Sequence, residues 1–325
     1  MNLADEIRAR IAAEGPIGVD VFMAAANAHY YATRDPLGVA GDFVTAPEIH
    51  QMFGEIVGAA LADVWVRADM RPDAIYAGMG PGRGTLANDA LRVMRRAGFD
   101  GDVHLIETSP ILREPQAHLL PEARFHDQIS DLPDRPLLLV ANEFFDALPV
   151  KQWIGGIERK IELAGDRFRF TADGPVQEVS PAREDVVRRL AKHIATHGGA
   201  AIIIDYGYSA GEKGDTLQAV RGHRFADPLA APGEQDLTSH VDFSALAEVA
   251  KSEGSRVSRV TSQGTWLETL GIGARAMALA AKNPADTENI AAARRRLCDE
   301  DEMGRLFKVM ALTGDGWPAV AGLEP

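Results

Sequence analysis

Between Pro72 and Tyr208 the chain alternates short, continuously apolar runs with amphipathic stretches. The apolar runs that we expect to form strands are Ala74–Met79, Val103–Glu107, Ala123–His126, Leu137–Ala141 and Ala200–Asp205. Runs of this kind are typical of parallel strands that helices cover on both faces. Apolar residues at helical spacing follow the first run and stop at Gly98, which predicts a crossover helix. The pattern therefore predicts an α/β fold with a doubly wound, Rossmann-like sheet.

The first seventy residues have a helical pattern instead. One apolar stripe lies within the first fourteen residues, and another begins at Ile49. Thr45 and Glu48, with Pro47 between them, form a capping-box pattern that predicts the start of the second helix. The intervening Tyr30–Pro47 is rich in Gly, Pro, Asp and Thr, so we expect an ordered loop and a candidate lid.

Two segments interrupt the α/β pattern. Residues 151–175 alternate around Gly and Asp turns, which predicts a small antiparallel insertion. Residues 209–240 are polar with little periodicity, and a loop of that length is usually functional. We therefore expect an N-terminal helical and lid region (1–70) and a core (71–325) that carries both insertions. For the tail we expect a helix near 243–253, a strand near 256–261, a helical region near 273–299 and a last strand at Leu306–Leu312.

Composition narrows the function classes. The 325 residues include 47 Asp and Glu against 34 Lys and Arg, a net charge of −13 that argues against nucleic-acid binding and favours a positively charged partner. Cys298 is the only cysteine, so an internal disulfide is excluded. We find no apolar run of about 18 residues and an acidic N-terminus, and we expect a cytoplasmic protein without membrane insertion. Asp236, His240 and Asp242 suggest a metal site only weakly, because Asp242 directly precedes a predicted helix, and we expect no metal.

A glycine-rich loop follows the first buried run. Gly78, Gly80, Gly82 and Gly84 occupy every second position, and the predicted crossover helix begins at once. This order lets backbone amides and a helix N-terminus approach a polar cofactor. A P-loop is excluded because the required lysine is missing, but a turn that only packs helix against strand stays open.

The ends of the next strands carry polar groups. Glu107 ends the second run, where a carboxylate can accept hydrogen bonds from both hydroxyls of an adenosine ribose. Nicotinamide and sulfonium cofactors both contain such an adenosine ribose. The alternative is that Glu107 is only an acid at the beginning of a helix. Asp127 and Gln128 follow the third run, where an adenine contact is expected.

The fourth run ends in ANEFFDALP, where three polar side chains are interleaved with two aromatic rings. These residues are Asn142, Glu143 and Asp146, with Phe144 and Phe145. Strand ends of a doubly wound sheet open onto the ligand crevice, and carboxylates beside aromatic rings suit a cation such as an arginine guanidinium. The alternative is that both phenylalanines belong to the core.

Several blocks together resemble the MidA-like methyltransferases, a family that includes the mitochondrial complex I assembly arginine methyltransferase. The blocks are GDFVTAPEIHQMFGE (41–55), GPGRGTL (80–86), HLIETSP (104–110), NEFFDALPVKQ (142–152), IDYGY (204–208), RGHRFADPL (221–229) and DLTSHVDF (236–243). The resemblance implies a class I S-adenosylmethionine-dependent fold: a seven-stranded doubly wound core with an N-terminal helical region and insertions. In mitochondria the family's activity is symmetric dimethylation of an arginine on a complex I subunit.

Carried over to this chain, the resemblance assigns roles to individual residues. The resemblance places cofactor contacts at Gly80, Gly82, Gly84 and Glu107, and we expect further ones at Asp127, Gln128 and Asn142. Glu143, Asp146 and Asn142 are the residues expected to face the acceptor and to carry the catalysis. The resemblance places acceptor and lid contacts at Asp42, Phe43, Thr45, Tyr206 and Tyr208, and we expect further ones at Tyr30, Phe144, Phe145 and His240. Gly78 departs from the family pattern, which has an acid there.

We therefore expect a methyltransferase that uses S-adenosyl-L-methionine and acts on an arginine of a protein, with a complex I subunit as one candidate and a homodimer as one candidate assembly. The alternative is a cofactor-binding assembly chaperone that has lost turnover, for which Gly78 is the best support. A nicotinamide oxidoreductase shares the glycine loop, but it does not explain NEFFDALP.

Overall fold

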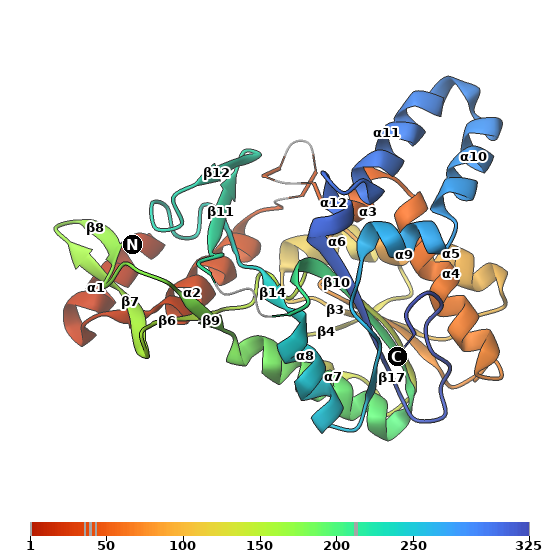
Figure 1. Ribbon diagram of the computed structural model, residues 1–325, viewed down its shortest axis with the longest axis horizontal. Helices are drawn as coiled ribbons and strands as arrows, with labels where there is room; N and C mark the ends of the chain where they lie inside the picture. The colour runs from red at the N-terminus through yellow and green to blue at the C-terminus, as the bar shows by residue number, and fades with distance from the viewer. Residues whose placement is uncertain (1, 36, 39–40, 43, 211–213, 325) are drawn as a thin grey trace. The chain divides into compact units, whose positions relative to one another are not determined.

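The computed structural model describes residues 2–35, 37–38, 41–42, 44–210 and 214–324. The chain divides into two compact units, which are described separately (Figure 1). Unit 1 consists of Met1–Val44, Phe145–Val186 and Gly211–Val241. Unit 2 consists of Thr45–Phe144, Val187–Ala210 and Asp242–Pro325. Both units are therefore discontinuous in sequence.

Unit 2 is built on a sheet whose main path has the strand order β15-β17-β10-β5-β2-β3-β4. The strands are β2 (Ile75–Met79), β3 (Val103–Ile106), β4 (Arg124–His126), β5 (Leu137–Asn142), β10 (Gly199–Tyr208), β15 (Arg256–Val257) and β17 (Phe307–Thr313). Neighbours from β10 to β4 pair in parallel, whereas β17 is antiparallel to both β10 and β15. This is the predicted seven-stranded, doubly wound sheet, with β16 (Thr261–Ser262) added beside β17.

Helices pack on the sheet because its strands are apolar on both faces. All residues of β2, β3 and β5 are buried. The helices of this unit are α3 (Ala46–Ile49), α4 (Met52–Arg67), α5 (Thr85–Arg96), α6 (Pro110–Leu119), α8 (Phe243–Ser252), α9 (Gln263–Thr269), α10 (Ile272–Lys282), α11 (Thr287–Cys298) and α12 (Met303–Leu306). Figure 1 shows α10 and α11 as an adjacent pair. One continuous cluster joins α4, α5 and α9–α11 to the sheet.

The start of the second N-terminal helix differs from the prediction. Thr45 is the N-cap of the single-turn helix α3, but its side chain makes no capping hydrogen bond, and the helix stops before α4 begins. The Glu48 carboxylate instead accepts a hydrogen bond from Thr85 Oγ1 at 2.6 Å. The capping box is wrong because Glu48 has a partner 37 positions away in sequence.

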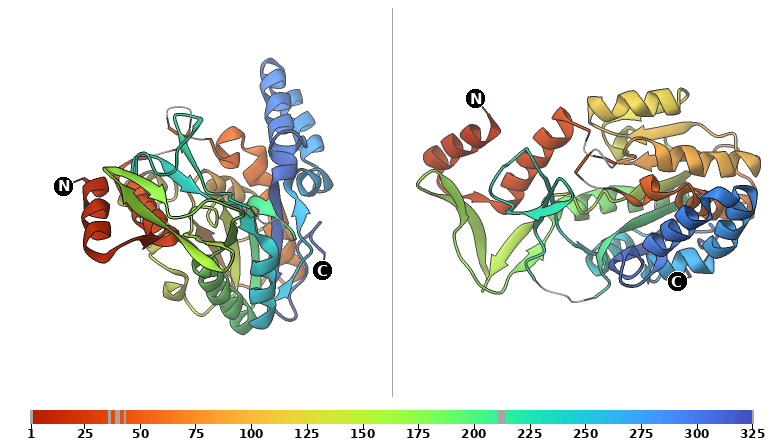
Figure 2. Two further views of the ribbon diagram at one scale, coloured as in Figure 1. Left: turned by 60° about the vertical axis from the view of Figure 1, so that its left-hand side comes forward. Right: turned by 90° about the horizontal axis from the view of Figure 1, so that it is seen from above.

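Unit 1 combines two N-terminal helices with two small sheets. The helices are α1 (Leu3–Glu14) and α2 (Val19–Thr33), and α7 (Pro181–His197) begins in this unit. The first sheet has the order β1-β7-β6-β9, with β8 beside β7, and its strands are β1 (Ile17–Gly18), β6 (Lys151–Ile154), β7 (Ile157–Ala164), β8 (Arg167–Phe170) and β9 (Gln177–Val179). Figure 2 shows the yellow-green strands of this sheet beside the red helices α1 and α2. Residues 151–175 thus fold into the predicted antiparallel strands.

Two loop predictions in unit 1 need correction. Residues Tyr30 and Tyr31 belong to α2 and not to a loop, because the helix continues to Thr33. Within 209–240 the chain forms a second sheet from β11 (Gln218–Arg221), β12 (Arg224–Ala226) and β13 (Asp236–Thr238). These strands are only three or four residues long and mix polar with apolar residues, so they lack the apolar alternation on which the prediction depended. The short β14 (Val241–Asp242) follows, and no helix in the described part of the chain is long and apolar enough to span a membrane.

Candidate functional site

The glycine loop of unit 2 runs from the end of β2 to the start of α5. Gly80, Gly82 and Gly84 all have positive φ, at 58°, 58° and 88°, a backbone region that other residues rarely adopt. A Cβ atom on Gly80 would lie 2.6 Å from Cδ2 of Phe144, so this position also requires the absence of a side chain. Gly84 is the left-handed N-cap of α5. The loop thus places the N-terminus of α5 at the carboxyl edge of the sheet, where β2 ends.

Glu107 directly follows β3 and is 8% exposed. Its Oε1 accepts a hydrogen bond from the Ser109 amide at 2.8 Å, and its Oε2 accepts one from Gln116 Nε2 at 3.2 Å. Burial raises the pKa of Glu107, although these hydrogen bonds oppose the shift. The same Gln116 amide donates to the Gly82 carbonyl at 2.5 Å, so one side chain joins the glycine loop to Glu107.

The chain bends at Glu143, directly after Asn142, which is the last residue of β5. Glu143 has φ of 50°, which is strained for a residue with a side chain. Its Oε1 accepts hydrogen bonds from the Ala46 amide at 3.0 Å and from Asn142 Nδ2 at 2.9 Å. The next residue, Phe144, lies against Gly80. Strain that the surrounding contacts maintain is typical of functional positions.

Asp205 on β10 supports this turn, and the sequence did not identify it as a site residue. It is fully buried, and its carboxylate accepts hydrogen bonds from the backbone amides of Phe144 at 3.2 Å and Tyr206 at 2.9 Å. The Glu143 amide donates to the Ile204 carbonyl at 2.9 Å. Neighbouring strand ends therefore fix the backbone on both sides of the strained residue.

Other predicted residues of unit 2 have different surroundings. Asp127 is largely exposed and pairs with Arg113 at 2.6 Å, and the exposed Gln128 caps a short 3₁₀ turn. Tyr206 packs edge-on against Phe307, and Tyr208 is buried at the end of β10. Gln116 thus joins Gly82 to Glu107, and Asn142 is bonded to Glu143. Arg113 also donates to the Glu107 carbonyl at 2.7 Å and so joins Asp127 to Glu107, whereas Gln128 interacts with its near neighbour Asp131.

Unit 1 holds the remaining predicted acceptor and lid residues. The Tyr30 hydroxyl donates to Asp42 Oδ2 at 2.5 Å, and Asp42 Oδ1 accepts from the Gly222 amide at 2.7 Å. Burial and the Asp42 hydrogen bond raise the pKa of Tyr30 well above its ordinary value. Phe145 and Asp146 are buried, and His240 is partly buried. Phe43 lies outside the described residues.

Arg183 connects several of these residues, although no pattern in the sequence marks it as a site residue. Its guanidinium is buried and donates to four backbone carbonyls and one hydroxyl, those of Phe145, Asp146, Ser239, His240 and the Ser239 side chain. Two segments that are more than ninety residues apart are therefore joined through one side chain. Asp242, the weak metal candidate, is the N-cap of α8, and the described residues contain no group of three or more His, Cys, Asp or Glu side chains placed to hold a metal.

Two buried acceptor atoms test whether a cofactor fits unit 2. Asn142 Oδ1 and Gln116 Oε1 are both inaccessible and have no hydrogen-bond partner among the residues that the structure describes. Buried polar atoms are almost always paired, so these two fit a ligand that brings donors. An adenosylated amino acid has both ribose hydroxyls and an ammonium group. Together with the glycine loop and Glu107, the chain has the donor and acceptor set for such a cofactor.

A sheet of this strand order, with a glycine loop after β2 and an acid after β3, defines the fold of class I S-adenosylmethionine-dependent methyltransferases. The family model of an S-adenosyl-L-methionine-dependent methyltransferase matches residues 56–175 and 156–261. The chain belongs to this family, as its resemblance to MidA-like methyltransferases predicted.

Individual relatives agree with this assignment. The chain is 34% identical to the mitochondrial protein arginine methyltransferase NDUFAF7 homolog of Drosophila melanogaster, over 96% of this chain and 84% of the relative. It is 32% identical to protein arginine methyltransferase NDUFAF7 of Mus musculus, over 93% and 82%. A crystal structure from Burkholderia thailandensis with S-adenosyl-homocysteine bound matches with a TM-score of 0.88 and 26% identity, over 99% of this chain and 95% of the other. S-adenosylmethionine is therefore the cofactor.

One prediction is corrected by these comparisons. The relatives from Drosophila melanogaster, Mus musculus and Xenopus laevis are all named as mitochondrial proteins. This contradicts the cytoplasmic location predicted from the acidic N-terminus, and we withdraw that prediction.

Proposed function

We propose that this chain transfers a methyl group from S-adenosyl-L-methionine to an arginine side chain of a protein acceptor. The observation that carries the proposal is the strained turn at Glu143, whose carboxylate two donors orient and whose next residue contacts the glycine loop. The names of the relatives support arginine as the target, and the resemblance to complex I assembly proteins supports a complex I subunit as acceptor.

The bound cofactor would supply an electrophilic sulfonium methyl group. Gly80, Gly82 and Gly84 would leave room for its amino acid part, and Glu107 would accept hydrogen bonds from the ribose. Glu143 would hold the guanidinium so that one nitrogen lone pair is aligned with the methyl carbon. Asn142 Oδ1 would accept a further hydrogen bond from the guanidinium. As the new C–N bond forms, the electron pair of the S–C bond stays on sulfur. The nitrogen then releases its proton, for which Glu143 is the proposed acceptor.

The remaining assignments follow the same proposal. Asp146 would be the second carboxylate for the acceptor, and the adjacent Phe144 and Phe145 would contact it. Tyr30, Asp42, Phe43, Thr45, Tyr206, Tyr208 and His240 would complete the acceptor and lid contacts. Asp127 and Gln128 would lie near the adenine. We propose the N-terminal region and the two insertions as the parts that recognise the acceptor, and a homodimer as the assembly.

Mass spectrometry of methylarginine tests this function in cells. A strain that lacks the gene is complemented with the wild type or with Glu143→Gln, and the proteins are labelled through deuterated methionine. We expect at least one methylarginine, with complex I subunits as the first place to look, that only the wild type restores. Calorimetry of the purified proteins with S-adenosylhomocysteine is the control: Glu143→Gln retains binding, Glu107→Ala loses it, and NADH does not compete. Identical methylarginine profiles in all strains would refute the proposal.

Gly78 favours a second candidate, a cofactor-binding assembly chaperone without turnover. Gly78 is buried in β2, and a Cβ atom there would lie 3.1 Å from the tip of Leu105 and 3.4 Å from Pro81, so this position is occupied without the acid of the family pattern. If Gly78→Glu gained cofactor affinity and created methyl transfer that the wild type lacks, the chaperone would be the better description. A fully active wild type dismisses it.

A further inference from the structure

A pocket of about 630 Å³ lies in unit 1 where β6 and β9 end. Its apolar wall includes Trp153, Val176 and Val179, and Asp215 supplies a carboxylate. Gly155, Gly156 and Gly174 also line the pocket and add no side chains that would narrow it. The chain's other tryptophans, Trp65, Trp266 and Trp317, are buried in unit 2, whereas Trp153 is only half-buried. The pocket lies largely within the insertions, but none of its residues has been given a role of its own above.

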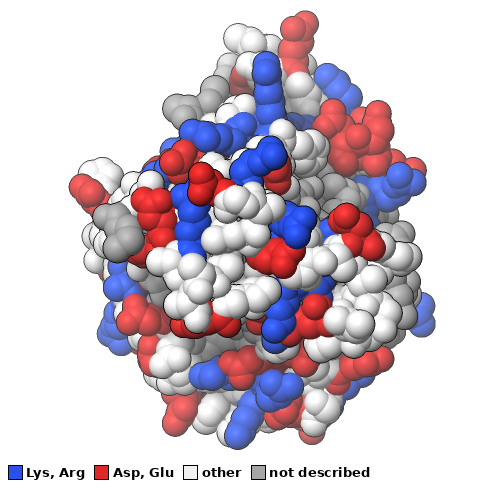
Figure 3. Space-filling model, turned by 90° about the vertical axis from the view of Figure 1, so that its left-hand side faces the viewer, with Lys and Arg blue, Asp and Glu red and all other residues white. Residues whose placement is uncertain are grey.

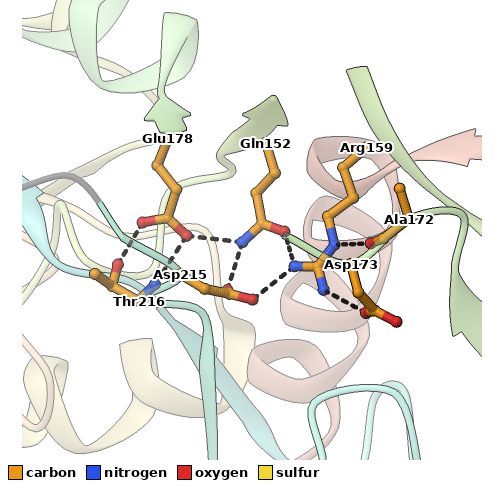
Figure 4. Close-up of polar contacts among 7 residues, drawn as sticks. All are labelled: Gln152, Arg159, Ala172, Asp173, Glu178, Asp215 and Thr216. Carbon is orange, nitrogen blue, oxygen red and sulfur yellow. Dashed lines mark hydrogen bonds and ion pairs between the residues drawn. The ribbon is translucent and has the colours of Figure 1, made fainter. Parts of the chain in front are cut away.

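A buried polar network fixes the charged wall of the pocket (Figure 4). The side-chain amide of Gln152, which is fully buried, donates to Glu178 Oε1 and to Asp215 Oδ1, each at 2.8 Å. Arg159 donates to Asp215 Oδ2 at 2.6 Å and to Gln152 Oε1 at 2.9 Å. Figure 4 shows these side chains in a row, with Thr216 bonded to Glu178 at one end. Asp215 is therefore held in one place.

The network has an excess of negative charge. It contains the carboxylates of Asp173, Glu178 and Asp215 against the single guanidinium of Arg159. The Asp215 side chain is 41% exposed although Arg159 is only 6% exposed, so the acid and not the base faces solvent. A rigid carboxylate and a half-buried indole that line the same pocket are complementary to a cation that has an aliphatic stem.

The charge of the surrounding surface does not by itself favour a cationic ligand. On the face shown in Figure 3, Lys and Arg side chains are interspersed with Asp and Glu, so neither sign dominates. Attraction by a broad field would require a surface of one sign. Charge recognition in this part of the molecule therefore depends on local groups such as Asp215.

We propose that this pocket binds a lysine or arginine side chain of the protein acceptor, at a residue other than the one that is methylated. The stem packs on Trp153 and Val179, and the charged head pairs with Asp215. This inference rests on the proposed function only in that the acceptor is a protein. It adds a docking contact that selects acceptors with a second cationic residue.

Fluorine NMR with 5-fluorotryptophan tests the pocket in the full chain. The Trp153 resonance is assigned by its loss in Trp153→Phe. The probes are the acetylated, amidated pentapeptides Gly-Gly-Arg-Gly-Gly and Gly-Gly-Lys-Gly-Gly, with a citrulline peptide as the neutral match for arginine. We expect both cationic peptides to shift the Trp153 resonance with saturation, and citrulline to bind about fivefold more weakly or worse.

Variants at Val179 keep the test independent of folding. Val179 is on the edge strand β9 and is 37% exposed, so Val179→Lys and Val179→Gln leave the core intact. We expect Val179→Lys to abolish the shift by repelling the peptide, whereas Val179→Gln retains it. Equal binding of arginine and citrulline peptides, or binding that Val179→Lys leaves unchanged, would overturn the inference. Cofactor binding and methylarginine are measured separately, so a failure of the proposed function remains distinguishable.

Discussion

Each unit joins three segments around an apolar cluster, but unit 2 is built on strands that are buried along their whole length, whereas unit 1 adds buried polar side chains that connect its segments. In unit 2, strands such as β2 and β5 are buried along their whole length. In unit 1, Arg183 and Asn27 connect segments through hydrogen bonds: the Asn27 amide donates to the carbonyls of Ala147 at 2.9 Å and Leu237 at 2.7 Å. Apolar packing tolerates many similar residues, but a buried hydrogen bond requires one donor in one place. The two units should therefore respond differently to substitution.

The largest effect is expected at Arg183. Arg183→Met fills a similar volume but leaves buried carbonyl groups without donors, which should cost about 3–5 kcal/mol. Hydrogen exchange followed by mass spectrometry compares the variant with the wild type. The variant should exchange faster in Phe145–Val186 and Gly211–Val241, and the strands of unit 2 should change little. Equal acceleration throughout the chain would remove the contrast between the units.

Gly80→Val tests the packing of the glycine loop. The new side chain would meet Phe144 at 2.6 Å and would be held at positive φ, so we expect a loss of roughly 100-fold in cofactor affinity, about 3 kcal/mol. Gly271→Ala is the control, because Gly271 also has positive φ but no atom within 4 Å of its Cβ position. Calorimetry with S-adenosylhomocysteine should show normal affinity for the control. If both variants lost affinity equally, backbone conformation and not the contact with Phe144 would be responsible.

Glu107→Gln separates binding from stability within unit 2. Removing the charged acceptor should weaken cofactor binding roughly tenfold or more. Because burial raises the pKa of Glu107 in the folded state, its contribution to stability is present below the ordinary Glu pKa and is lost as pH rises through the raised value. The variant without cofactor should therefore melt above the wild type at pH 7, and the difference should disappear near pH 4. A lower Tm at pH 7 would contradict this sign.

The smallest effect is expected for Asp205→Asn. The amide retains one acceptor oxygen, so only one of the two backbone amides of Phe144 and Tyr206 loses its partner. We expect methyl transfer to fall about tenfold while cofactor affinity stays within a factor of two, in line with the ~1.4 kcal/mol that one such hydrogen bond contributes. Single-turnover rates and calorimetry on the same samples would check this. A parallel fall in affinity would mean that Asp205 supports the fold and not the turn.

The two units also differ in how far their sequences predict them. The parallel strands, the glycine loop and Glu107 follow from local patterns, because apolar runs and glycine spacing report local conformation. Arg183, Gln116 and Asp205 were missed because their partners lie elsewhere in the chain, and a single buried polar residue has no periodicity. The capping box at Thr45 failed for the same reason, since Glu48 bonds to Thr85. The sheet of β11–β13 was missed because its strands are too short, at three or four residues, for an alternating pattern to stand out.

The discontinuity of unit 1 has a consequence for synthesis on the ribosome. Its first segment ends at Val44 and its last at Val241, so helices α1 and α2 emerge long before their partners. At ~5–20 residues per second this interval is roughly 10–40 seconds. During that time the apolar face of α2, with Phe22 and Met23, has none of its later neighbours from β6, β7 and β13 to cover it. We therefore expect the nascent N-terminal segment to bind a chaperone at the exit tunnel before the protein can act on any partner of its own.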